Sequence, residues 1–293
     1  MKCEAIHRNR GRHTIWEMCK ALGMNKSTYY KWLIRREKQK NRLEQERILI
    51  EKVREVFNDH KRVYGYRKMS EALLDKNIEL SHYKIRKIMK QNGLFPEIVH
   101  KFKPYPKGKS DGRYSENILN QKFDSERPDQ QWAGDITYIK TNLGWVYLSV
   151  VMDLYNREIV GYSVSRDIGT ELVKRSLSDA LVRVESHEGL IFHSDRGVQY
   201  SSKSFSKMIK EYGIIPSMSR SGCPYDNSCV ERFFCSLKRE CIYRKRYSTM
   251  EEVERDLFEY IELFYNRKRL HSSLGYLSPV DYRIRQREQS LAS

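Results

Sequence analysis

The sequence predicts two kinds of structure: an all-α first third, and an α/β remainder in which helices flank a mixed sheet. One observation is the residue pattern, because residues 13–94 carry apolar residues at helical spacing, whereas residues 131–166 contain three runs rich in Val, Ile and Tyr. The other is charge. Residues 1–110 contain 28 Lys and Arg against 12 Asp and Glu, while residues 111–293 are nearly balanced. A basic section of this kind is typical of proteins that bind a polyanion, most commonly nucleic acid.

Composition excludes several other classes of protein. The chain has no stretch of about 18 apolar residues that could cross a membrane. Its N-terminus lacks the apolar segment of a secretory signal. Six cysteines in 293 residues fit reduced thiols better than a disulfide scaffold. We therefore expect a cytoplasmic protein.

Residues 1–42 are predicted to form a helix-turn-helix segment. Gly23 ends a first helix, and Asn25 or Ser27 caps a second helix that is basic and aromatic. Lys31 and Arg35 are its candidate DNA contacts.

Residues 43–100 are predicted to form a second DNA-binding domain of the helix-turn-helix type. Ser81 caps a helix that Gly93 ends, and Lys84 and Lys87 point outward as candidate DNA contacts. Two helical hairpins with solvated lysines remain the alternative for the basic third.

Residues 101–123 are predicted to be a basic linker, because they carry Pro and Gly without apolar periodicity.

Residues 124–245 then contain three strands with short turns, followed by helix, strand, helix, strand and a last helix that begins near Asn227. This order is that of the ribonuclease-H-like fold. Residues 246–293 are predicted to be a C-terminal helical tail, whose basic cluster, Arg267 to His271, either contacts DNA or packs on the core.

Three carboxylates are the best candidates for chemistry. Asp135 lies inside the first strand, where a charge is costly unless it has a partner or a metal. Asp195 ends the fourth strand, and Glu231 lies on the last helix. Such acids can converge on Mg²⁺ or Mn²⁺, and two ions would support an in-line phosphoryl displacement.

Two other acids compete for these roles. Asp153 is an alternative first ligand, although it fits better as a strand-end residue that meets Asn156 or Arg157. Asp226 competes with Glu231, but its place before the helix suggests a loop or capping residue. The four cysteines from 223 to 241 recur every six residues, a spacing that does not suit the short C-x₂₋₄-C pairs of zinc sites.

The segments WAGDITYI, HSDRGVQY, DNSCVERFFCSLKRE and YNRKRLHSSLGYLSP resemble the catalytic domain of OrfB-type insertion-sequence transposases, relatives of retroviral integrases. The 35 residues between Asp195 and Glu231 match the D,D(35)E signature of that family. The resemblance spans roughly residues 120–283, and residues 64–94 resemble the family's upstream helix-turn-helix.

The resemblance implies that Asp135, Asp195 and Glu231 bind divalent metal ions and that Lys238 contacts the ends of the element. Asn227 shares a helix face with Glu231, which would let it orient substrate or a metal-bound water. His193 faces the same side as Asp195; it either positions the leaving strand or is a structural histidine.

We therefore expect a transposase that binds the terminal inverted repeats of a mobile element, cleaves there and joins the 3′-hydroxyl to target DNA. A homo-multimer on double-stranded DNA is expected, near the bacterial nucleoid. An upstream-frame protein, separate or fused by frameshifting, is a further expected partner. The alternatives are a ribonuclease-H-like nuclease without strand transfer and a helix-turn-helix regulator.

Overall fold

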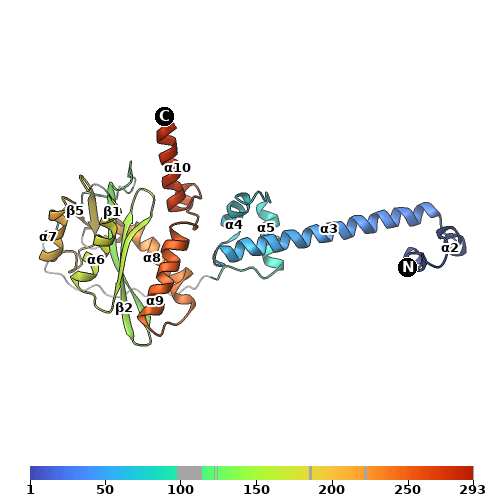
Figure 1. Ribbon diagram of the computed structural model, residues 1–293, viewed down its shortest axis with the longest axis horizontal. Coiled ribbons are helices and arrows are strands. Elements are labelled where there is room, and N and C mark those ends of the chain that lie inside the picture. Colours follow the sequence, from blue (N-terminus) through green and yellow to red (C-terminus); the bar gives the residue numbers. More distant parts are fainter. Residues whose placement is uncertain (98–113, 122, 124, 185–186, 221–222, 293) are drawn as a thin grey trace.

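The computed structural model describes residues 1–97, 114–121, 123, 125–184, 187–220 and 223–292 (Figure 1). Most of the predicted linker, residues 101–113 and 122, lies outside the described residues. Among the helices that are described, none is both long and apolar enough to cross a membrane.

The N-terminal helices form a small cluster of their own. α1 (Lys2–Asn9) and α2 (Ile15–Ala21) pack against the start of α3 (Lys26–Asp59) around the buried Ile6, Cys19 and Tyr29. Gly23 makes the turn between α2 and α3 with a φ of +57°, which a residue with a Cβ rarely adopts.

The predicted division between residues 42 and 43 falls inside α3, which is one continuous helix of 34 residues. No Gly or Pro interrupts residues 26–59, so nothing in the sequence stops the helix. Residues 34–48 are exposed on every side, and Figure 1 shows this stretch as an arm between the two helical clusters.

The second helical cluster consists of the end of α3 with α4 (Tyr66–Leu74) and α5 (His82–Gln91). The Ser81 hydroxyl accepts a hydrogen bond from the Lys84 amide, which confirms the predicted cap. Apolar side chains from all three helices form its core.

Five strands form one mixed sheet in the order β3-β2-β1-β4-β5. The first three are the long antiparallel strands β1 (Gln131–Thr141), β2 (Gly144–Asp153) and β3 (Ile159–Ser165), as the sequence predicts. The short strands β4 (Ile191–Ser194) and β5 (Ile215–Met218) add in parallel to β1. The ribonuclease-H-like order of elements is therefore confirmed.

Helices cover both faces of the sheet. α6 (Thr170–Leu181) and α7 (Lys203–Glu211) pack on one face, in a core that includes Trp132, Val160 and Leu177. A 3₁₀ turn (Pro224–Asn227) leads into α8 (Ser228–Glu240), which packs on the other face with Val150 and Phe233 in its core.

The predicted tail is part of this second core. η2 (Ile242–Arg244) follows α8, and α9 (Met250–Phe258) continues into a π-helical stretch, η3 (Glu259–Tyr265). Their buried side chains share one hydrophobic cluster with α8 and the sheet. η4 (Ser272–Leu274) and α10 (Pro279–Ala292) complete the chain.

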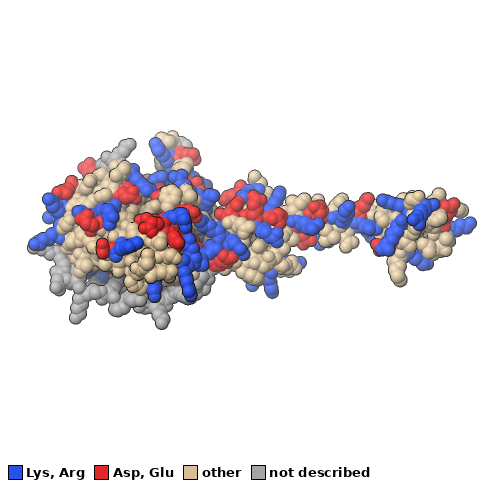
Figure 2. All heavy atoms as spheres, turned by 60° about the horizontal axis from the view of Figure 1, so that its bottom comes forward, with Lys and Arg blue, Asp and Glu red and all other residues tan. Residues whose placement is uncertain are grey.

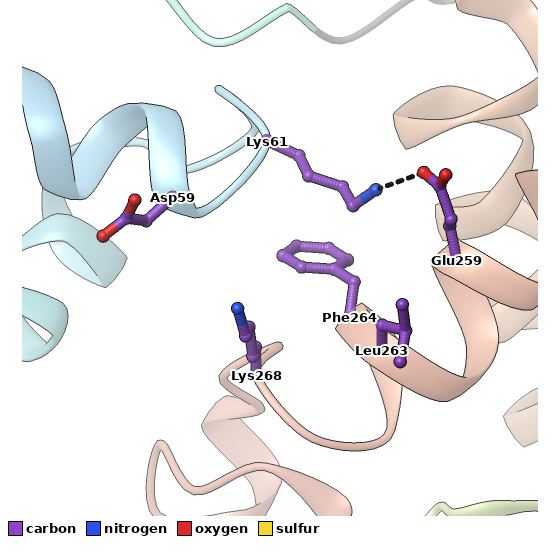
Figure 3. Close-up of a pocket in the computed structure, with 6 residues that line it drawn as sticks. All are labelled: Asp59, Lys61, Glu259, Leu263, Phe264 and Lys268. Carbon is purple, nitrogen blue, oxygen red and sulfur yellow. Dashed lines mark ion pairs between the residues drawn. The ribbon is translucent and has the colours of Figure 1, made fainter.

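The second helical cluster docks on this C-terminal segment, and the same hydrophobic cluster runs through both. A cavity of about 250 Å³ lies at the junction (Figure 3). On one side of it Lys61 pairs with Glu259 at 3.7 Å. Its lining residues are Asp59, Lys61, Glu259, Leu263, Phe264 and Lys268.

Candidate active site

The register of two parallel strands brings Asp135 and Asp195 to one end of the sheet. Ala133 pairs with His193, and each aspartate lies two residues further along its own chain. Neighbouring parallel strands in register carry equivalent positions side by side. The Asp195 carboxylate accepts a hydrogen bond from the Gly197 amide at 2.9 Å, and Asp135 accepts one from the Ile136 amide at 2.8 Å.

A glycine lies close to each aspartate in the sequence, and neither glycine leaves room for a Cβ. A Cβ at Gly134 would lie 2.5 Å from Cζ of Phe192, so a larger residue does not fit directly before Asp135. A Cβ at Gly197 would lie 2.9 Å from Oδ1 of Asp195. Gly134 was not singled out from the sequence, where its signal is its place inside a strand.

α8, which packs on the sheet, carries the third candidate acid, Glu231. Glu231 lies in the first turn of this helix and is exposed, between Asn227 and Lys238 on the same helix face. Both of these neighbours contact β1 close to Asp135, as described below. Glu231 is therefore held on the side of the helix that borders the strand carrying Asp135.

Asn227 fixes the start of α8 against the sheet. Its Nδ2 donates to the carbonyl oxygen of Gly134 at 3.2 Å, and the residue is 5% exposed. Within the described part of the chain, its Oδ1 is buried without a hydrogen-bond partner. Since buried polar atoms are rarely left unsatisfied, this oxygen marks a place where a ligand or water fits.

Lys238 lies at the other end of the same face. Its Nζ is 4.8 Å from the centre of the Tyr138 ring, a cation–π contact with β1. Burial lowers the pKa of Lys238, and the charge of Asp135 opposes this shift. Tyr138, which sequence reasoning did not single out, thus holds the lysine near Asp135.

His193 is fully buried in β4, and both ring nitrogens are engaged. Nδ1 lies 2.9 Å from the Ser217 hydroxyl and Nε2 lies 3.1 Å from the Ser219 hydroxyl. Burial lowers its pKa to about 4, so the ring is neutral near pH 7. This placement favours the structural role over contact with the leaving strand.

Asp226 has a structural environment rather than an open one. It is fully buried and accepts hydrogen bonds from Asn117 and Gln121, each at 2.8 Å, and from the Arg220 amide at 2.9 Å. Burial alone would raise its pKa, but hydrogen bonds from Arg220 and its other donors lower it well below its usual range. Its donors leave it poorly placed to act as a metal ligand.

Asp153 ends β2 with 2% exposure, but its partners differ from those expected. It accepts hydrogen bonds from the amides of Asp129 at 3.0 Å and Tyr155 at 2.9 Å, rather than meeting Asn156 or Arg157 side chains. Asn156 donates instead to Glu158 and to the Pro279 carbonyl. Burial raises the pKa of Asp153 to about 7.

The donor set at the sheet end suits a hard divalent cation. Carboxylate and amide oxygens are the ligands that such ions prefer, and the buried Oδ1 of Asn227 supplies an unused acceptor beside Asp135. In the described residues, no three His, Cys, Asp or Glu side chains already form a group that could hold a metal ion.

The predicted DNA contacts of the helical third are exposed. Lys31 and Arg35 lie on α3, and Lys84 and Lys87 on α5. Figure 2 shows Lys and Arg side chains spread along the arm formed by α3 and over the N-terminal helices. These positions leave the lysines and arginines accessible to a phosphate backbone.

Comparisons with known proteins agree with this architecture. Residues 125–224 and residues 231–287 match families described as integrase core domain, and residues 44–102 match one described as HTH-like domain. The Transposase InsF for insertion sequence IS3A of Escherichia coli (strain K12) is 36% identical over 282 residues, which cover 96% of this chain and 98% of that protein. The transposase for insertion sequence element IS904 of Lactococcus lactis subsp. lactis (strain IL1403) is 39% identical over 245 residues, 83% of this chain and 96% of that protein.

Two solved structures are also similar. The HTLV-2 integrase catalytic core domain in complex with magnesium (trimeric form) is 15% identical, with a TM-score of 0.43, covering 54% of this chain and 98% of that one. The catalytic domain of Mos1 mariner transposase is 16% identical, with a TM-score of 0.39, covering 45% and 70%.

The fold and the domain matches define a polynucleotidyl transferase with an integrase core and an HTH-like domain. Within that class, the chain belongs to the family of insertion-sequence transposases, since curated members align over nearly its whole length.

Proposed function

We propose that Asp135, Asp195 and Glu231 form the active site of this transposase and hold divalent metal ions, Mg²⁺ or Mn²⁺, two per site. The observation that carries the proposal is the pairing of β1 with β4, which brings the two aspartates to the same end of the sheet. The contacts of Asn227 and Lys238 with β1 support Glu231 as the third acid.

The same site would serve two phosphoryl transfers. In the first, water attacks a phosphorus at the element end, the bond to the 3′-oxygen breaks, and a 3′-hydroxyl is released. In the second, that 3′-hydroxyl attacks a target phosphorus, a new P–O bond forms, and the target's own 3′-oxygen leaves. Bound metal ions would activate the attacking oxygen and stabilise the leaving one.

The chain's own residues would orient these reactants. The three carboxylates hold the cations, Asn227 accepts a hydrogen bond from a water through its unpaired Oδ1, and Lys238 contacts a phosphate of the element end. Neutral His193 supports β4 through Ser217 and Ser219, so its contribution is indirect.

The helical third would select the terminal inverted repeats, with Lys31, Arg35, Lys84 and Lys87 as phosphate or base contacts. Two element ends must be brought together, so a homo-multimer on double-stranded DNA is the expected active form, in the cytoplasm at the nucleoid. An upstream-frame protein, separate or fused to this chain, would complete the complex.

The decisive experiment compares Glu231→Gln with Asp226→Asn on duplexes that carry the element's terminal repeats, with Mg²⁺. Because Glu231 is exposed and Asp226 is buried with several donors, Glu231→Gln is expected to lower cleavage by at least about a hundredfold while leaving thermal stability unchanged. Asp226→Asn is expected instead to lower the free energy of unfolding by about 1–3 kcal/mol.

Both cleaved and joined strands are mapped in that assay, with Glu211→Gln on α7 as a control that keeps full activity. Full cleavage by Glu231→Gln would show that the third acid lies elsewhere. Cleavage without any joined product from the unmodified chain would favour the nuclease without strand transfer.

A further inference from the structure

The loop between α3 and α4 has an unusual backbone. Lys61 and Arg62 are consecutive and both have positive φ values, 54° and 58°. Residues with a Cβ rarely adopt this conformation, and a strained backbone persists only where its surroundings hold it in place. The loop lies at the junction between the second helical cluster and the integrase core (Figure 3).

The carbonyl oxygens of Lys61 and Arg62 both accept hydrogen bonds from other segments of the chain. Arg244 of the core donates from Nη1 to the Lys61 carbonyl at 2.8 Å, and the Glu97 amide donates to the Arg62 carbonyl at 2.9 Å. The Glu97 carboxylate lies between two cations: it pairs with Arg62 at 3.0 Å and with Arg244. Glu97 thus ties the end of the helical cluster to the core through the strained loop.

Tyr64 makes a second connection from the same loop. It is 1% exposed, its hydroxyl accepts a hydrogen bond from the Leu270 amide at 2.7 Å, and it donates to the Lys268 carbonyl at 3.3 Å. Its ring stacks on His60 with centroids 4.5 Å apart. One buried side chain therefore joins the helical cluster to the segment after η3.

These contacts fix α5 relative to the sheet. α5 packs on α3 and α4 in the same hydrophobic cluster that continues into α8 and α9. α8 in turn carries Glu231 and is attached to β1 by Asn227. A continuous set of packed elements thus connects the helix that bears Lys84 and Lys87 with the proposed catalytic acids.

We propose that Tyr64, Glu97 and Arg244 are positioning residues that determine which phosphodiester is cut, because they fix the distance between the base pairs bound by α5 and the acids at the sheet end. The inference rests on the proposed function. It goes beyond that function in one respect: the helical cluster recognises the sequence, and this junction determines which phosphodiester is cut.

The test uses the full chain with Tyr64→Phe and with Glu97→Gln, on a duplex that carries a terminal repeat. Cut positions are mapped at single-nucleotide resolution, and affinity is measured by titration without metal. We expect unchanged affinity within about twofold, and ~10-fold more cuts at neighbouring phosphodiesters, which corresponds to about 1.4 kcal/mol of positioning free energy. Hydrogen exchange of the Leu270 amide should accelerate in Tyr64→Phe, because its acceptor is removed.

Arg183→Ala is the matched control, since Arg183 lies just after α6 and forms its ion pairs within the core, with Glu262 of η3 at 3.1 Å and with Asp179 of α6 at 3.8 Å. It should leave the cut positions unchanged. If Tyr64→Phe and Glu97→Gln lower only the yield or the melting temperature while every cut stays at the same phosphodiester, the junction is merely structural and the proposal is overturned. An unmodified chain that does not cut at all would instead refute the proposed function, and the two failures are therefore distinguishable.

Discussion

At the scale of single residues, the environment of each acid separates structural carboxylates from those available for chemistry. Asp226 and Glu231 are five positions apart, yet the first is fully buried among donors and the second is exposed. The spacing in the sequence favoured Glu231, but two of the donors that engage Asp226, Asn117 and Gln121, lie more than a hundred positions away. Contacts of that kind leave no local signal in the sequence.

Asp153 should make stability depend on pH. Its pKa is about 7 in the folded chain and near 4 in an unfolded one, so between these values the folded state binds more protons. The free energy of unfolding should therefore fall as pH rises from about 4 to 7, by up to about 4 kcal/mol from this group. Urea titrations across that range should show the slope in the unmodified chain and a flatter one in Asp153→Asn. Equal slopes would contradict the assignment.

Arg269 and Arg267 differ in their surroundings within the C-terminal basic cluster. The Arg269 side chain is 11% exposed and donates to both carboxylate oxygens of Glu240, at 2.8 and 2.7 Å, whereas Arg267 is exposed. Arg269→Ala should lower the free energy of unfolding by about 3–5 kcal/mol, because it removes the ion-pair partner of the buried Glu240 carboxylate. Arg267→Ala, measured by the same chemical denaturation, should change it by less than about 0.5 kcal/mol.

At the scale of elements, strands were predictable because their pattern is local, whereas packing partners were not. The three long strands and Gly23 follow from residue type and turn chemistry. The continuity of α3 agrees with the absence of any helix-breaking residue between 26 and 59, although the predicted division of the helical third falls inside this helix. Likewise, the participation of α9 and η3 in the core depends on their contacts with α8, which composition does not reveal.

Gly161 should prove indispensable for the packing of α6 on β3. A Cβ there would lie 2.4 Å from the Ser176 carbonyl oxygen and 2.5 Å from the Ala180 amide nitrogen, both of which are backbone atoms that cannot move aside. Gly161→Ala should therefore lower the free energy of unfolding by about 1–3 kcal/mol or more. Gly169→Ala at the start of α6 is the control, since a Cβ there meets nothing within 4 Å. Equal melting temperatures for the two variants would contradict this packing argument.

At the scale of the whole molecule, the excess of positive charge lies in the helical third and not in the integrase core. The net charge of +17 lies almost entirely in residues 1–110, which leaves the integrase core nearly neutral. Association with DNA should therefore be governed by the helical third and depend strongly on salt.

The salt dependence of DNA binding should reveal these contacts. Lys84→Ala and Lys87→Ala should each reduce the slope of log K against log salt by about one, because each removes one phosphate contact. Lys207→Ala on α7, whose side chain pairs with Glu211, should leave the slope unchanged. Fluorescence anisotropy at several salt concentrations measures the slope, and an unaltered slope in both α5 variants would remove α5 from the interface.

The exposed middle of α3 has a mechanical consequence. Residues 34–48 are exposed on every side, and the whole helix is about 51 Å long at 1.5 Å per residue. A bend of a few degrees near its centre therefore displaces the small N-terminal cluster, while the second cluster stays docked on the core. The position of the first helices relative to the rest of the protein is therefore set by the stiffness of a single helix.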